Sequence, residues 1–95
     1  MNKTVIVTGA NSGIGKAASI QLAQQGALVV MLCRNKERGE RALQDVKAAA
    51  QSENVELILV DMASQASVRK AVNEFLSRHT KLDALIHNAA NFDHT

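Results

Sequence analysis

A glycine-rich turn, Thr8-Gly9-Ala10-Asn11-Ser12-Gly13-Ile14-Gly15, connects a short apolar run at residues 5–7 to a stretch with helical spacing. Phosphate groups bind where glycines let the backbone come close and where a helix N-terminus offers free N–H groups. A helix that begins at about Gly13 satisfies both conditions. The alternative interpretation is a tight strand-to-helix turn that uses glycine only for its own geometry.

The spacing of the glycines excludes two other phosphate-binding loops. The dinucleotide fingerprint G-x-G-x-x-G is absent, because the glycines stand at positions 9, 13 and 15. A P-loop has four residues between its first glycine and a Gly-Lys pair that Ser or Thr follows, whereas five residues separate Gly9 from Gly15 and Ala17 has no hydroxyl. Nucleoside triphosphate hydrolysis is therefore not expected.

Four apolar runs are typical of strands, and two of them are nearly continuous, as in parallel sheets that are covered on both faces. The runs span residues 5–7, 27–32, 55–60 and 82–86. The stretches between them have helical spacing, and this alternation predicts right-handed crossovers and an α/β fold with a parallel sheet.

Three helices are expected between these strands. The first begins at about Gly13 and ends at a C-cap on Gly26, the second runs from Asn35, its N-cap, to about Ser52, and Ser64 caps the third. Apolar spacing places these residues on the core face: Ile14, Ala18 and Leu22 in the first helix, Leu43, Val46, Ala49 and Ala50 in the second, and Val68, Ala71, Val72, Phe75 and Leu76 in the third.

The turn resembles the T-G-x-x-x-G-x-G signature of the short-chain dehydrogenase/reductase family, which binds NAD or NADP there. Asp61-Met62 resembles the family's adenine-contacting pair, and His87-Asn88-Ala89-Ala90 resembles its N-N-A-G motif, so the resemblance covers the whole chain. It implies a Rossmann-type doubly wound parallel sheet in which residues 1–95 form the N-terminal, dinucleotide-binding half, with four strands in the order 3-2-1-4 and three helices. The cofactor-binding residues that it implies are Gly9, Asn11, Ser12, Gly13, Ile14, Gly15, Asp61, Met62, Asn88, Ala89 and Ala90.

The sequence departs from the family's last motif at two positions. His87 replaces the first Asn and Ala90 replaces the Gly, so only Asn88 and Ala89 match, and the methyl group of Ala90 is expected to crowd the ribose side of the cofactor. This variant, together with Cys33-Arg34-Asn35, is similar to what the retinol-dehydrogenase-like and protochlorophyllide-reductase-like branches carry. The similarity favours NADP and identifies no substrate.

The residues after the second strand predict which nicotinamide cofactor binds. In dinucleotide folds an acidic side chain at this point binds the ribose 2′-hydroxyl, whereas an arginine accommodates a 2′-phosphate. Here the stretch reads Cys33-Arg34-Asn35, with Arg38 one helical turn further on as a second cation. A guanidinium donates two parallel hydrogen bonds to phosphate, so NADP is predicted in preference to NAD. The alternative is that Arg34 is only one of several solvated charges.

Three further side chains have competing interpretations. Asp61 is expected to accept from the adenine amino group, and the alternative is that it caps the approach to the third helix. Cys33 is interpreted as a small residue at the edge of the core rather than a nucleophile. His87 is interpreted as a structural substitute at a strand end. No metal is predicted, because the histidines do not have the spacing of metal ligands.

Composition limits the chemistry. The 95 residues contain two Phe, no Tyr and no Trp, and their net charge is only +2, so aromatic stacking on nucleic acid is disfavoured. Members of the family use a Tyr-x-x-x-Lys pair and a serine for acid–base chemistry. No such pair exists here, so we expect this chain to hold no catalytic residue and to be inactive alone.

Three hypotheses of function remain. The first is the NADP-binding part of an oxidoreductase that transfers hydride between nicotinamide and a small carbonyl or alcohol substrate. The others are a non-catalytic nucleotide-binding or regulatory module, and a truncated remnant that needs a partner chain along the exposed fourth strand, where self-association is also expected. A single cysteine and no apolar stretch near the roughly 20 residues of a membrane span predict a cytoplasmic protein.

Overall fold

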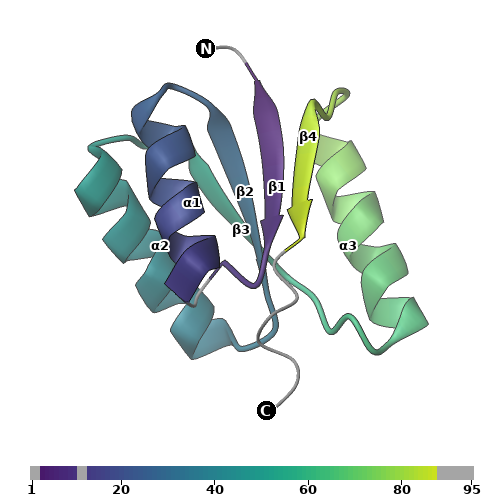
Figure 1. Ribbon diagram of the computed structural model, residues 1–95. Helices are drawn as coiled ribbons and strands as arrows, with labels where there is room; N and C mark the ends of the chain where they lie inside the picture. Colours follow the sequence, from purple (N-terminus) through teal and green to yellow (C-terminus); the bar gives the residue numbers. More distant parts are fainter. Residues whose placement is uncertain (1–2, 11–12, 88–95) are drawn as a thin grey trace.

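The computed structural model describes residues 3–10 and 13–87, in which strands and helices alternate along the chain (Figure 1). The strands are β1 (Thr4–Thr8), β2 (Leu28–Cys33), β3 (Val55–Leu59) and β4 (Ala84–His87). The helices are α1 (Gly13–Gln24), α2 (Lys36–Ala50) and α3 (Gln65–Arg78). Every predicted element is present in the predicted order.

The four strands form one parallel sheet in the order β3-β2-β1-β4, which confirms the predicted topology. Thr8, at the end of β1, pairs with Leu32 of β2 on one side and with His87 of β4 on the other. Cys33, the last residue of β2, pairs with Leu59 of β3. The carboxyl ends of all four strands therefore lie in one row, and the segments that follow them meet at the same edge of the sheet.

Helices cover both faces of the sheet, with α1 and α2 on one face and α3 on the other (Figure 1). Neighbouring residues of β2 are buried in different layers: Met31 packs with the core under α1 and α2, and Val30 packs with Phe75 of α3. Both side chains are fully buried. A strand that packs on both faces has no polar side, which explains the continuous apolar run in the sequence.

The helix ends follow the predicted capping signals. Asn35 caps α2 with its side chain, Ser64 caps α3, and Gly26 has a φ of +91° just after α1. This backbone conformation is costly for any residue with a Cβ, so glycine suits the position.

The predicted core face of α1 is confirmed only in part: Leu22 packs against the core, but Ile14 is exposed. Ile14 is 74% exposed, whereas Gly15, Ser19 and Ala23 are the buried residues of the helix. The Ser19 hydroxyl donates to the carbonyl of Gly15 at 2.8 Å, so a polar side chain is satisfied inside the core. A search for apolar residues alone passes over such a serine.

Two helix residues with apolar side chains on the predicted core face of α3 are in fact exposed, Val72 by 49% and Leu76 by 59%. Leu85 of β4 is 58% exposed as well. In α2, Ala49 is also exposed, and the buried residues there are Gly39, Ala42 and Val46.

Strand β4 begins at Ala84, two residues later than predicted. The backbone N–H of Asp83 donates to the carbonyl of Thr4 at 2.9 Å, and the Asp83 carboxylate accepts from the Thr4 N–H at 2.8 Å. The Asp83 carboxylate thus accepts a hydrogen bond from Thr4 that a backbone carbonyl would accept if β4 extended to this point. The hydrogen bond from the Thr4 N–H lowers the pKa of Asp83 below its ordinary value. Burial has a smaller, opposing effect, and Lys81 lowers the pKa further.

Candidate cofactor-binding site

The glycine turn lies between the end of β1 and the first turn of α1. Gly9 has a φ of +62° and Gly13 a φ of +28°, conformations that side chains with a Cβ rarely adopt. Space around Gly13 is open, since an added Cβ would meet no atom within 4 Å. The backbone at Gly13 therefore has open space where a side chain would stand.

The turn is tied to the sheet and leads into a helix end without acidic side chains. The Gly9 N–H donates to the carbonyl of Leu32 at 3.1 Å, which joins the turn to the end of β2. The first turn of α1 contains no acidic residue, so nothing there competes with a bound anion. Ile14 is exposed in this first turn and available to a ligand. Asn11 and Ser12, also predicted to bind the cofactor, lie outside the described residues.

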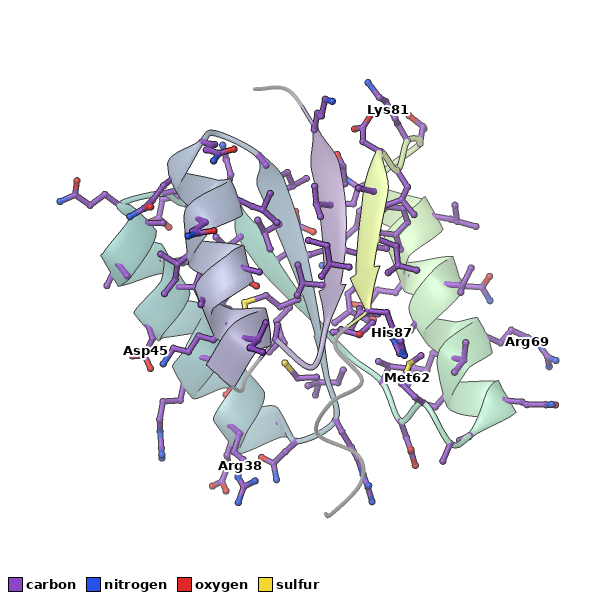
Figure 2. All side chains as sticks on the ribbon, viewed as in Figure 1. Arg38, Asp45, Met62, Arg69, Lys81 and His87 are labelled. Carbon is purple, nitrogen blue, oxygen red and sulfur yellow. The ribbon has the colours of Figure 1, made fainter. Side chains whose placement is uncertain are left out.

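Two arginines flank the start of α2. The Asn35 side chain accepts from the backbone N–H of Arg38 at 2.9 Å and fixes the first turn of the helix. Arg34 and Arg38 are exposed, and in the described ranges neither guanidinium forms an ion pair. Figure 2 shows Arg38 at the end of α2 that lies on the side where the strand arrows end. The arrangement offers two cations and a helix N-terminus to an anion, although the first turn of α2 also carries the acidic Glu37.

Gly39, which the sequence analysis did not single out, sets how closely α2 approaches the sheet. A Cβ at this position would lie 3.2 Å from Cβ of Cys33 and 3.2 Å from Cδ1 of Leu57. Glycine therefore lets the first turn of α2 rest on β2 and β3. The only signal in the sequence was a glycine inside a predicted helix, where it lowers helix stability unless packing requires it.

Asp61 follows the third strand and is held by its neighbours. Its Oδ1 accepts from the Ala63 N–H at 3.0 Å, and its own N–H donates to Oγ of Ser67 at 2.8 Å. Ser64, not Asp61, is the N-cap of α3, so the capping alternative holds only in that Oδ1 shapes the turn before the helix. Met62, which follows, is 55% exposed and offers an apolar surface.

The end of β4 carries His87, whose Nδ1 lies 3.0 Å from Oγ1 of Thr8. This contact agrees with the interpretation of His87 as a structural residue at a strand end. Asn88, Ala89 and Ala90 of the same motif lie outside the described residues.

The register brings the predicted groups to one edge of the sheet, apart from the five residues not described. The glycine turn follows β1, Arg34 follows β2, Asp61 lies just beyond β3, and His87 ends β4.

Cys33 is buried, in agreement with its interpretation as a core residue. Within residues 3–10 and 13–87, no three His, Cys, Asp or Glu side chains are grouped as metal ligands would be. Across the same residues, no helix has the length and apolar character to span a bilayer.

Sequence comparison identifies relatives of this chain. A model of the short chain dehydrogenase family matches residues 3–94. Dehydrogenase/reductase SDR family member 13 from Bos taurus is 49% identical over 87 residues, 92% of this chain and 23% of that protein. Retinol dehydrogenase 13 from Mus musculus is 39% identical over 88 residues, 93% of this chain and 26% of that protein. The predicted resemblance to retinol dehydrogenases is confirmed, and the chain spans about a quarter of the length of these relatives.

Solved structures share the fold. Menthone neomenthol reductase from Mentha piperita superposes with a TM-score of 0.86 at 32% identity, over 94% of this chain and 32% of that structure. L-Sorbose reductase from Gluconobacter frateurii, solved in complex with NADPH and L-sorbose, superposes with a TM-score of 0.82 at 31% identity, over 93% of this chain and 33% of that structure. Together with the family match over residues 3–94, these likenesses show that the chain belongs to the short-chain dehydrogenase/reductase family and has its Rossmann fold.

Proposed function

We propose that this chain is the NADP(H)-binding portion of an oxidoreductase that transfers hydride between nicotinamide and a carbonyl or alcohol substrate. The observation that carries the proposal is the pair Arg34 and Arg38 at the capped start of α2, where a ribose-binding carboxylate would select NAD. A 2′-phosphate at this point meets two guanidinium groups and the N-terminus of α2.

The remaining contacts are assigned by the order of the strand ends. The pyrophosphate would lie on the glycine turn at the start of α1, where backbone N–H groups and the helix dipole favour negative charge. The adenine would lie near Asp61 and the exposed Met62. The family resemblance implies that Asn88 and Ala89, which lie outside the described residues, contact the nicotinamide ribose. The cofactor supplies the hydride chemistry when bound, and these residues bind and orient it.

Support for NADP over NAD also comes from the fold's neighbours. L-Sorbose reductase, 31% identical, is described in complex with NADPH. We infer that the proton transfer that accompanies hydride transfer depends on a residue that is not among these 95, since they include no tyrosine. The chain alone is then a cofactor-binding unit without turnover.

The test is a comparison of NADP and NAD binding by the unmodified chain and by Arg34→Asp. We expect the unmodified chain to bind NADP more tightly, and its thermal midpoint to rise as NADP is added, because a ligand of the folded state stabilises it. Loss of charge-assisted hydrogen bonds in Arg34→Asp should weaken NADP binding by about 10- to 100-fold. NAD binding should be retained or strengthened, because a carboxylate at this position accepts from the ribose 2′-hydroxyl.

The matched control is Arg69→Asp, which makes the same change in net charge on α3, in the other helical layer (Figure 2). It should keep the preference for NADP. An unchanged preference in Arg34→Asp would overturn the assignment of the 2′-phosphate site, and no binding of either dinucleotide by the unmodified chain would overturn the proposed function as a whole.

A further inference from the structure

A network of hydrogen bonds holds Asp61 just beyond the end of β3. Three of its atoms are engaged: the N–H donates to Oγ of Ser67 at 2.8 Å, Oδ1 accepts from Ala63 at 3.0 Å, and the carbonyl accepts from the Ser64 N–H at 3.0 Å. The preceding residue, Val60, is buried and donates its N–H to the carbonyl of Cys33 at 2.9 Å. Asp61 is therefore fixed both to the sheet and to the start of α3.

Ser67 has an unusual part in this network. Its backbone N–H donates to Oγ of Ser64, the N-cap of α3, at 3.1 Å. In a capping box the side chain at this helix position bonds back to the N–H of the N-cap residue. Here the Ser67 hydroxyl reaches three residues further back and accepts from the N–H of Asp61. The first turn of α3 thus holds the residue that follows the end of β3.

The consequence is that one carboxylate oxygen remains for a ligand. Oδ1 of Asp61 is occupied by Ala63, and Oδ2 accepts no hydrogen bond from the part of the chain that the structure describes. The neighbouring Met62 side chain is exposed and apolar. An aromatic base that packs on Met62 and carries an amino group can donate to Oδ2, whereas a base with a carbonyl at the same place presents an acceptor to a carboxylate.

We propose that Ser67 is a positioning residue for base selection: its hydroxyl holds Asp61 so that Oδ2 accepts from the 6-amino group of adenine and disfavours a 6-carbonyl base. The inference rests on the proposed function, because it assumes that the adenine of a dinucleotide reaches this edge.

The experiment compares dissociation constants for NADP and for its deaminated counterpart, in which hypoxanthine replaces adenine. The unmodified chain should prefer NADP by about tenfold, the worth of one hydrogen bond to a charged group. Ser67→Ala removes one of the three hydrogen bonds that hold Asp61 and should lower this preference by about threefold. Ser67→Thr keeps the hydroxyl and should restore it.

The matched control is Ser64→Ala, which removes the neighbouring hydroxyl of the same cap but not the bond from Asp61 to Ser67. It should lower the thermal midpoint and keep the preference for adenine. If Ser67 had only a structural role, Ser67→Ala would also keep that preference. Binding of NADP with the same preference in Ser67→Ala as in the unmodified chain would overturn this inference alone. Failure of the unmodified chain to bind either dinucleotide would overturn the proposed function and this inference with it.

Discussion

Thr8 and His87 stand 79 residues apart in the chain, yet Oγ1 of Thr8 lies 3.0 Å from Nδ1 of His87. Thr8 is buried at the point where β1 passes into the glycine turn, and His87 is the last residue of β4. The bond joins the turn to the neighbouring strand end. A histidine at the first position of the His-Asn-Ala-Ala motif therefore has a structural partner within the turn that the family uses for cofactor binding.

We predict that Thr8 and His87 are energetically coupled. In a double-mutant cycle of Thr8→Val and His87→Ala, the coupling in the free energy of unfolding should be about 0.5–1.5 kcal/mol, the usual worth of one hydrogen bond. Urea unfolding curves measure it. His87→Asn, which introduces the family's residue with its own donor and acceptor, should retain more stability than His87→Ala. Purely additive effects would show that the contact contributes nothing.

A second prediction concerns the close approach of α2 to the sheet at Gly39. Valine at this position places its Cβ against Cys33 and Leu57, so Gly39→Val should lower the free energy of unfolding by about 1–3 kcal/mol, as overpacking does. It should also weaken NADP binding, because Arg38 moves with the helix. Glu40→Val is the control: the same side chain enters an exposed position and costs only helix propensity, about 0.5 kcal/mol. Equal losses in the two variants would contradict the packing argument.

A third prediction follows from Asp83. The Thr4 N–H lowers the pKa of Asp83 below its ordinary value of 3.8, and Lys81 acts in the same direction. A carboxyl whose pKa is lower in the folded state contributes stability above its unfolded pKa, and this contribution is lost as the pH falls through the folded value. The chain should therefore lose stability on acidification below about pH 4.

Urea midpoints measured between pH 2 and pH 6 check this expectation. Asp83→Asn should make the chain less stable than the unmodified chain at neutral pH, and the difference should disappear at the acid end. Lys81→Met removes only the smaller effect on the pKa of Asp83. Its urea midpoints should therefore lie between those of Asp83→Asn and those of the unmodified chain. A constant difference between Asp83→Asn and the unmodified chain across the whole range would be incompatible with the proposed titration.

Local signals explain what could be predicted from the sequence. Asn35, Ser64 and Gly26 act on the backbone within a few residues, so their capping roles were correctly predicted. The parallel sheet followed from the alternation of strand and helix, and the order of its strands followed from the family resemblance. Arg34 and Asp61 were placed at strand ends by the same reasoning, and the structure brings them to one edge.

What depended on contacts between distant residues was missed. Nothing near His87 in the sequence indicates Thr8 as its partner, and nothing near Gly39 indicates that Cys33 lies against it. The buried Ser19 shifted the core face of α1 because its hydroxyl is satisfied by a backbone carbonyl. In α3 the apolar spacing correctly predicted that Phe75 is buried. Spacing alone does not show how many of the apolar residues on that face the sheet covers, and Val72 and Leu76 are exposed.

Phe75 and Leu76 are adjacent in α3 but differ in burial. Phe75 is buried at 7% exposure and packs with Val30 and Ile58, whereas Leu76 is 59% exposed. Phe75→Ala should lower the free energy of unfolding by about 3–5 kcal/mol, enough to unfold a marginally stable chain. Leu76→Gln should change it by less than about 0.5 kcal/mol, because the side chain leaves little apolar contact behind.

Leu76→Gln should instead change how the chain associates. Val72 and Leu76 of α3 and Leu85 of β4 are exposed apolar side chains, and β4 is an outer strand of the described sheet, a combination that favours self-association. Sedimentation over a range of concentrations should show less association for Leu76→Gln than for the unmodified chain, while Glu74→Gln on the same helix leaves association unchanged. A large loss of stability in Leu76→Gln would mean that this surface is already covered in solution, and equal association in both variants would assign self-association to another part of the molecule.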